Sequence, residues 1–173
     1  MKGVFFMKKW STKMLVTLAM MVAIQVVLCR FLSINAWNMR LGFDFIPMVI
    51  VGIMYGALPA GAAGIVSDLI GALLFPSGTF FPGYTVTAFL SAFTFGLLLH
   101  KKQTMPRITV TVIITQFVLA LFLQTYWIHV QYASPYWTLV VSRIPQCLIM
   151  AVLQFVSIKV IAKTLARYQG KKA

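Results

Sequence analysis

One stretch of this sequence restricts the possible folds more than any other: from Phe45 to Phe75 the chain is almost continuously apolar. A helix that crosses the hydrocarbon core of a bilayer needs about 20 such residues, so the stretch is too long for one crossing. Pro59 and Gly61 lie near its centre and predict a break there, because proline lacks a backbone donor and glycine permits unusual dihedral angles. We therefore expect two membrane helices joined by a tight turn, with Pro47 in the first turn of the first helix.

Composition extends this expectation to the whole chain of 173 residues. Hydrophobic residues make up 61% and charged residues 10%, and the mean hydropathy is +0.92, which is far more apolar than a soluble domain. The length has room for about six spans with short loops. The predicted fold class is therefore an all-α integral membrane protein in the lipid bilayer, with residues 1–173 as a single domain of six transmembrane helices. Outside the apolar stretch, helices are expected at residues 12–32, 85–99, 108–128 and 137–163.

Basic residues set the expected topology, since lysine and arginine near span ends stay on the cytoplasmic side. With six crossings both termini share a side, and that side collects Lys2, Lys8, Lys9, Lys13, Lys101, Lys102, Arg107, Lys159, Lys163, Arg167, Lys171 and Lys172. Both termini are therefore predicted to be cytoplasmic, in a cell membrane. The net charge of +13 does not indicate nucleic acid, because these cations flank apolar segments. The basic start also resembles a secretory signal, but the first apolar run is better interpreted as the first span.

Three arginines do not follow this charge pattern: Arg30, Arg40 and Arg143 lie on the opposite side. Any one of them is explained equally well by a side chain that reaches the lipid headgroups. Three together, with only Asp44 and Asp68 as counter-charges, favour an anionic ligand, because a guanidinium binds carboxylates through a bidentate fork. Asp68 is the only carboxylate within a predicted span, and it is expected either to be functional or to pair with Arg30 or Arg143.

Polar residues in the last two predicted helices form two stripes at spacings of three or four. One stripe contains Gln116, Ala120, Gln124, Trp127 and Gln131, and the other contains Arg143, Gln146, Met150 and Gln154. Lipid cannot satisfy these groups, so they are expected to meet each other, water or a ligand. Hydrogen bonds between helices are the alternative explanation for the glutamines. The stripes predict a polar interior shared by the two helices.

The segment FPSGTFFPGYT, residues 75–85, carries more aromatic surface than a turn needs. Its prolines and glycines are expected to prevent a helix: Pro76, Gly78, Pro82 and Gly83. Exposed aromatic rings are unfavourable in water, so its rings are expected to pack against protein, lipid or a ligand: Phe75, Phe80, Phe81 and Tyr84.

Small residues recur four apart in three of the predicted helices, at Gly52 and Gly56, Ala60 and Gly64, and Ala19 and Ala23. Such pairs let helices approach closely, and packing within the bundle is the simplest explanation. Ala19 and Ala23 lie in a helix otherwise rich in methionine and valine. This pair is therefore also a candidate for contact with another subunit.

Motifs of catalysis and cofactor binding are absent from the sequence, including the phosphate-binding loop, H-E-x-x-H, G-x-S-x-G and the Gly-rich dinucleotide turn. Cys29 and Cys147 lie in apolar segments without metal-ligand spacing. We expect no cofactor, no metal site and no enzymatic activity. A protein of this kind that moves a solute against a gradient needs energy from another subunit.

Three segments resemble one known family: LGFDFIP at Leu41 to Pro47, VGIMYGALPAGAAGIVSDLIGALLFPSG after it, and TFFPGYTVTAFL. With the length and the six-span plan, they are similar to the folate-specific substrate-binding (S) components of energy-coupling factor (ECF) vitamin transporters. The segment LAMMVAIQ resembles the AxxxA docking motif of that family, which falls on Ala19 and Ala23. The resemblance implies a protein that captures a vitamin on the outer face. It also implies association with a transmembrane coupling subunit (EcfT) and two ATP-hydrolysing subunits (EcfA and EcfA').

Folate has an aromatic pterin, a benzoyl linker and a glutamate tail with two carboxylates, and this chemistry suggests roles for the candidate residues. The tail would be bound by Arg30, Arg40 or Arg143. The pterin edge would pair with Asp68, or with one of Asn38, Gln124 and Gln146. Aromatic faces would come from Phe80, Phe81 and Tyr84 as a cap and from Trp127 within the pocket. The alternatives are an S component for riboflavin or pantothenate, and a small membrane enzyme acting on lipid head groups.

Overall fold

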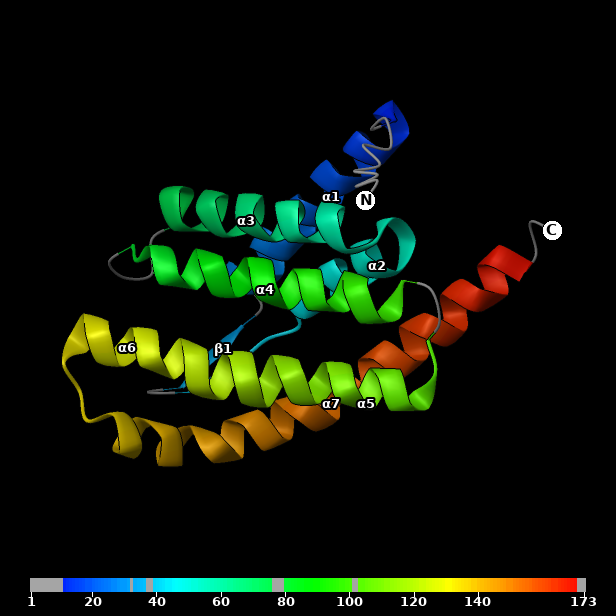
Figure 1. The fold of residues 1–173 in the computed structure, drawn as a ribbon. Helices are drawn as coiled ribbons and strands as arrows, with labels where there is room; N and C mark the ends of the chain where they lie inside the picture. The colour runs from blue at the N-terminus through cyan, green and yellow to red at the C-terminus, as the bar shows by residue number, and fades with distance from the viewer. Residues whose placement is uncertain (1–10, 32, 37–38, 76–79, 101–102, 171–173) are drawn as a thin grey trace, which may run out of the picture.

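The computed structural model of the chain describes residues 11–31, 33–36, 39–75, 80–100 and 103–170. Most of the helices run roughly along one direction, and the first helix lies obliquely to them (Figure 1). The Thr12 end of the first helix and the Gly170 end of the last lie at the same end of the bundle (Figure 1). The elements in chain order are α1 (Thr12–Phe31), β1 (Ile34–Ala36), β2 (Met39–Leu41), α2 (Phe45–Tyr55), α3 (Ala57–Leu74), α4 (Pro82–Leu99), α5 (Met105–Ile113), the π-helical segment η1 (Ile114–Leu123), α6 (Gln124–Tyr132) and α7 (Tyr136–Gly170).

Five helical stretches of the described chain are long and apolar enough to cross a membrane: α1, α3, α4, the continuous rod formed by α5, η1 and α6, and α7 as far as Leu165. The helical membrane class is thus confirmed. The helix α2, which the six-span prediction also needs as a crossing, has only 11 residues. At about 1.5 Å per residue it is roughly 16 Å long, about half of the hydrocarbon core. Six complete crossings are therefore not confirmed.

The all-α prediction implied an irregular connector after α1, but this connector contains two short strands. It contains a small antiparallel hairpin in which Ile34 pairs with Leu41, and Asn35 with Arg40. The strand β2 contacts α7, so the hairpin lies within the bundle and not beside it.

The apolar stretch breaks at Gly56, and the predicted break at Pro59 and Gly61 was wrong. Gly56 has φ of +92°, a left-handed value that glycine adopts without steric cost. Pro59 instead lies in the first turn of α3, where its missing N–H has no helical partner to lose. Gly61 is buried against the ring of Phe89. A Cβ on Gly61 would lie 2.6 Å from Cε2 of that ring.

The start of α4 also differs from the prediction, because Pro82 and Gly83 belong to this helix and do not stop it. Pro82 is the first helical residue, a position that suits its fixed φ, and Phe81 precedes it in an extended conformation. The helix thus begins three residues before the predicted Thr85 and includes Tyr84. Pro76 and Gly78 lie outside the described residues.

Glycines bring α2, α3 and α4 into backbone contact, which confirms the packing explanation for these small residues. A Cβ on Gly52 would lie 2.8 Å from the backbone nitrogen of Gly96. A Cβ on Gly64 would lie 2.9 Å from the Ala88 carbonyl oxygen. The helix α3 therefore lies along α4, and α4 in turn contacts the α5–η1–α6 rod, which contacts α7 (Figure 1).

Candidate ligand-binding site

Most of the predicted site residues that the structure describes lie towards one end of the bundle. At this end α3 finishes, α4 starts and α6 joins α7, opposite the end that holds Thr12 and Gly170 (Figure 1). We call it the α6–α7 end. Residues far apart in sequence meet here because four helices begin or finish within it.

Three aromatic residues from α4 and α6 form a group at this end, which we call the aromatic group: Phe81, Tyr84 and Trp127. The ring centroids of Phe81 and Trp127 are 5.6 Å apart, and those of Phe81 and Tyr84 are 6.0 Å apart. The indole of Trp127 lies against Gly83, where a Cβ would be 2.4 Å from Cδ2 of the ring. The sequence prediction that these aromatic residues pack together with other groups is thus confirmed for Phe81 and Tyr84.

Two hydrogen bonds tie the aromatic group across the α4–α6 contact. The Trp127 Nε1–H donates to the Thr87 hydroxyl at 3.1 Å, and the Tyr84 hydroxyl donates to Oε1 of Gln131 at 2.8 Å. Both bonds join side chains more than 39 residues apart in the chain. They fix the orientation of the indole and the phenol relative to α4.

Arg143 on α7 is buried, with 6% of its surface exposed. Its Nη1 donates to the Thr125 hydroxyl on α6 at 3.1 Å, while Nε has no hydrogen-bond partner among the described residues. The guanidinium also interacts electrostatically with Tyr84 of the aromatic group. A buried guanidinium in a membrane bundle costs about 3 kcal/mol or more unless it is paired. This arrangement fits a site that receives an anion.

Gln146, also predicted for the site, is buried three residues after Arg143. Residues three apart on a helix share a face. The two side chains therefore project from α7 towards the same part of the bundle.

Asp68 and Arg30 lie on the other flank of α4, around α3. The Thr85 hydroxyl donates to Oδ2 of Asp68 at 2.7 Å. The Arg30 guanidinium lies against Gly71, with Nε and Nη2 each 3.3 Å from where a Cβ would stand. Because Asp68 and Gly71 are three apart, both charged groups approach the same face of α3.

The remaining predicted residues are less clearly grouped. Phe80 is 52% exposed, unlike its neighbour Phe81. Gln124 is half-buried at the first position of α6. Arg40 lies in β2 opposite Asn35, and Asn38 lies outside the described residues.

The predicted stripe on the fifth long helix does not share one face. Gln116 donates to Gln154 on α7 at 2.9 Å, and Thr115 donates to the same oxygen at 3.1 Å. Trp127 and Gln131, by contrast, bond to α4. For Gln116 and Gln154 the alternative explanation, hydrogen bonds between helices, is confirmed. Thr115 and Gln116 lie within the π-helical segment η1, whereas Trp127 and Gln131 lie in α6 after it, and the π-helical turns change the direction in which the side chains point.

Sequence reasoning missed Gly83, Thr85 and Thr87 as site residues. Threonine is common in membrane helices and often bonds its own helix, so its presence in TVT carried no specific signal. Gly83 was interpreted as a helix breaker, although its lack of a side chain is what admits the Trp127 ring. The one available signal was the glycine directly beside an aromatic residue in FPGY.

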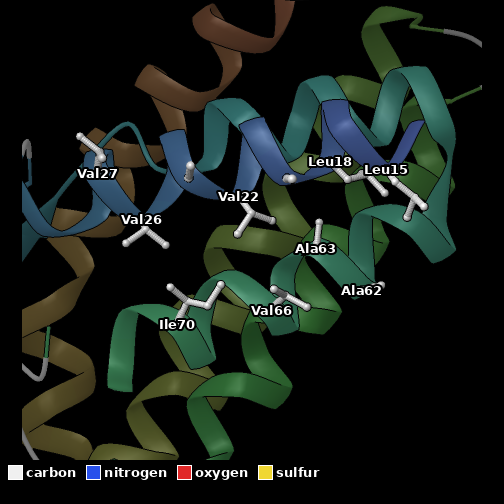
Figure 2. A pocket seen from close by; sticks show the side chains of 11 residues that line it. Leu15, Leu18, Val22, Val26, Val27, Ala62, Ala63, Val66 and Ile70 are labelled. Atoms are coloured by element: carbon white, nitrogen blue, oxygen red, sulfur yellow. The ribbon is translucent and has the colours of Figure 1, made fainter. Parts of the chain in front are cut away.

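A second feature is an apolar groove of about 520 Å³ between α1 and α3. Ala19 and Ala23 are exposed on α1 and lie in its wall. Figure 2 shows the side chains of both helices around the groove. It is lined by Leu15, Leu18, Ala19, Val22, Ala23, Val26, Val27, Ala62, Ala63, Val66 and Ile70.

Comparisons with known proteins give consistent results. The family described as ECF transporter, substrate-specific component, matches residues 13–162. A protein of Clostridium novyi (strain NT) named Folate transporter FolT is 35% identical over 145 residues, covering 83% of each chain. A protein of the same name from Leuconostoc mesenteroides is 31% identical over 126 residues, covering 72% of this chain and 68% of that one. A crystal structure of FolT bound with folic acid superposes with a TM-score of 0.84 at 26% identity, over 89% of this chain and 95% of the other.

Proposed function

The chain belongs to the family of ECF transporter substrate-specific components, and from this premise we propose that it is a folate-binding S component that delivers folate to an ATP-driven coupling module. As a member of that family it is a multi-pass membrane protein with a transport function. The single observation that carries the choice of folate is the close similarity to a FolT structure that holds folic acid. The chemistry of the α6–α7 end supports the same choice.

Folate needs aromatic faces, hydrogen-bonding groups for the pterin edge and cations for two carboxylates. The aromatic group supplies the faces, with Phe81, Tyr84 and Trp127 held by contacts across α4 and α6. Arg143 is the first choice for the glutamate tail, because it is buried and its Nε is unpaired among the described residues. Arg30 and Arg40 are the other cations proposed for the tail, and Phe80 is proposed as an outer cap.

The pterin edge offers adjacent N–H donors, which a carboxylate or an amide oxygen can accept. Asp68 is proposed for this role because Thr85 fixes one of its oxygens at 2.7 Å. Gln146, Gln124 and Asn38 are the alternative partners of the pterin edge. Burial of Gln146 on the same face as Arg143 makes it the strongest of the three.

A titration of the purified protein with a panel of vitamins tests the proposed function. We expect folate to bind with a stoichiometry of one, and riboflavin, thiamine and pantothenate not to bind, because none of these three carries two carboxylates beside a pterin. Isothermal calorimetry in detergent or nanodiscs gives the stoichiometry directly. Stoichiometric binding of another vitamin without folate binding would move the chain to a different specificity. Metal-dependent turnover of a lipid head group would revive the enzyme alternative.

We propose that residues 1–173 form one substrate-binding domain in the cell membrane, with both termini cytoplasmic and the α6–α7 end outside. Exposed basic residues such as Lys13, Arg107 and Lys163 support this orientation, because they lie towards the end opposite the site. In a chain whose two native cysteines are replaced by alanine, we expect a membrane-impermeant maleimide to label Ala133→Cys in intact cells. Lys163→Cys should react only after permeabilisation. The opposite labelling pattern would show that the termini are outside and the α6–α7 end is cytoplasmic.

We propose the groove between α1 and α3 as the docking surface for the transmembrane coupling subunit EcfT, which in turn binds two ATPase subunits, EcfA and EcfA'. The groove is apolar, and the small side chains of Ala19 and Ala23 form part of its α1 wall. Small residues permit the close approach of a partner helix in lipid. Energy for uptake would then come from ATP hydrolysis on the partners.

A further inference from the structure

Thr87 links the backbone of α4 to the indole of Trp127. Its hydroxyl donates to the Gly83 carbonyl at 3.1 Å, and the same oxygen accepts the Trp127 Nε1–H at 3.1 Å. Thr87 is 8% exposed, so water competes little for either bond. The proton of the hydroxyl is committed to the backbone, which leaves a lone pair directed at the indole.

Gly83 lies directly against the same ring. A Cβ at this position would lie 2.4 Å from Cδ2 and 2.8 Å from Cε2 of Trp127, distances that real Cβ contacts do not reach. Only glycine therefore lets the indole lie against the α4 backbone. Gly83 thus provides both the space for the ring and the carbonyl that orients Thr87.

The ring of Phe81 completes the enclosure, with its centroid 5.6 Å from that of Trp127 and the planes tilted by 48°. Trp127 itself belongs to α6, which follows the π-helical segment of the rod. Its indole is therefore held by two residues of α4 and the residue before it: Gly83 lies on its face, Thr87 at its N–H and Phe81 beside it. A side chain held in this way has lost its rotamer freedom before any ligand arrives.

We propose that Thr87 and Gly83 are positioning residues that fix the Trp127 ring for stacking on a flat ring of the ligand. This inference rests on the proposed folate-binding function. Ordering one rotamer-rich side chain on binding weakens affinity by about 2- to 12-fold. A preordered Trp127 avoids that loss. Neither Thr87 nor Gly83 needs to touch the ligand for this effect.

The test replaces Thr87 by valine, which keeps the shape of the side chain and removes the hydroxyl. Thr87→Ser keeps the hydroxyl and serves as the rescue. The matched control is Thr94→Val on the same helix, since the Thr94 hydroxyl donates to the carbonyl of Leu90 in its own helix at 2.7 Å. Folate affinity is measured by calorimetry on the full chain. Acrylamide quenching of Trp127 is measured without ligand, in a chain whose other tryptophans, Trp10, Trp37 and Trp137, are phenylalanine.

We expect Thr87→Val to bind folate about 2- to 12-fold more weakly, with increased quenching of Trp127, while Thr87→Ser and Thr94→Val match the parent chain. Gly83→Ala should weaken binding further, because the ring must move. Equal affinity of Thr87→Val and the parent would overturn the inference and leave the proposed function intact. Weaker binding without a change in quenching would also overturn it, since Thr87 would then act by another route. Failure of the parent chain to bind folate would reject the proposed function and this inference with it.

Discussion

Replacing Arg143 by alanine is expected to weaken folate binding by a factor of about 30 or more. Truncating one partner of a buried, hydrogen-bonded charge pair costs about 2–5 kcal/mol of binding free energy. With a folate carboxylate bound, Arg143 would be one partner of such a pair. It is 6% exposed, and its Nε has no partner among the described residues. Nη1 donates to the Thr125 hydroxyl. The fork is therefore largely available for a carboxylate of the glutamate tail.

The choice of ligands separates a role at the tail from a general role in the pocket. Pteroate has the pterin and the benzoyl ring but lacks the glutamate, so Arg143→Ala should cost much less for pteroate than for folate. Arg143→Lys keeps the charge but not the fork, and an intermediate affinity is expected. Arg107→Ala, an exposed arginine at the other end of the bundle, is the matched control. Equal losses for folate and pteroate would show that Arg143 does not contact the tail.

Thermal unfolding of the same variants distinguishes a direct role of Arg143 in ligand binding from a role in stabilising the fold. A buried guanidinium whose Nε has no partner among the described residues is costly to keep in the bundle, so its removal should leave the unfolding temperature unchanged or raise it. If Arg143→Ala instead unfolds at a markedly lower temperature without ligand, Arg143 stabilises the fold and the loss of binding has a different cause.

Helix positions could be predicted from this sequence because long apolar segments specify membrane helices through burial alone. The helix expected at residues 12–32 is observed as Thr12–Phe31. The break in the apolar stretch could not be assigned, because three breakers stand within six residues. Pro59 is harmless in a first turn, and Gly56 had an alternative explanation as a packing residue. Which of the two glycines adopts a positive φ depends on the packing around the break.

The hairpin after α1 escaped detection for a different reason. Strands of three residues are too short for an alternating pattern to stand out from a polar connector. The strand β2 also contacts α7, which comes from the other end of the chain. No local signal in the sequence reports such a contact.

The candidate site was predictable in its residue types and less so in its geometry. Phe81 and Tyr84 were identified because aromatic residues have no role in making a turn, and Arg143 because it violates the charge rule. The polar stripe failed across η1, since a π-helix bonds i to i+5 and each residue turns by less than in an α-helix. Over ten residues this difference accumulates. Gln116 therefore faces α7 and Trp127 faces α4, although their spacing predicts one face.

Replacing Ala19 and Ala23 together by tryptophan is expected to reduce folate uptake at least about 10-fold while folate affinity is unchanged. The two positions are four apart on one face of α1 and form part of the groove wall, so two indoles would fill the space proposed for a coupling helix. Losing the close approach of helices removes the van der Waals packing that drives their association in lipid. The candidate site residue on α1, Arg30, lies seven residues beyond Ala23 and does not line the groove, and most of the others lie on other helices, so folate affinity should not change.

The matched control is Met20→Trp with Ile24→Trp, which adds the same bulk to the neighbouring face of α1. These residues are 60% and 44% exposed and do not line the groove. Uptake is measured with radiolabelled folate in cells that contain the coupling subunits, and affinity by calorimetry on the purified protein. If the control pair reduces uptake as strongly as the alanine pair, bulk on α1 is harmful wherever it lies. Docking would then not depend on the groove. Loss of folate affinity in the alanine pair would instead indicate that α1 supports the site.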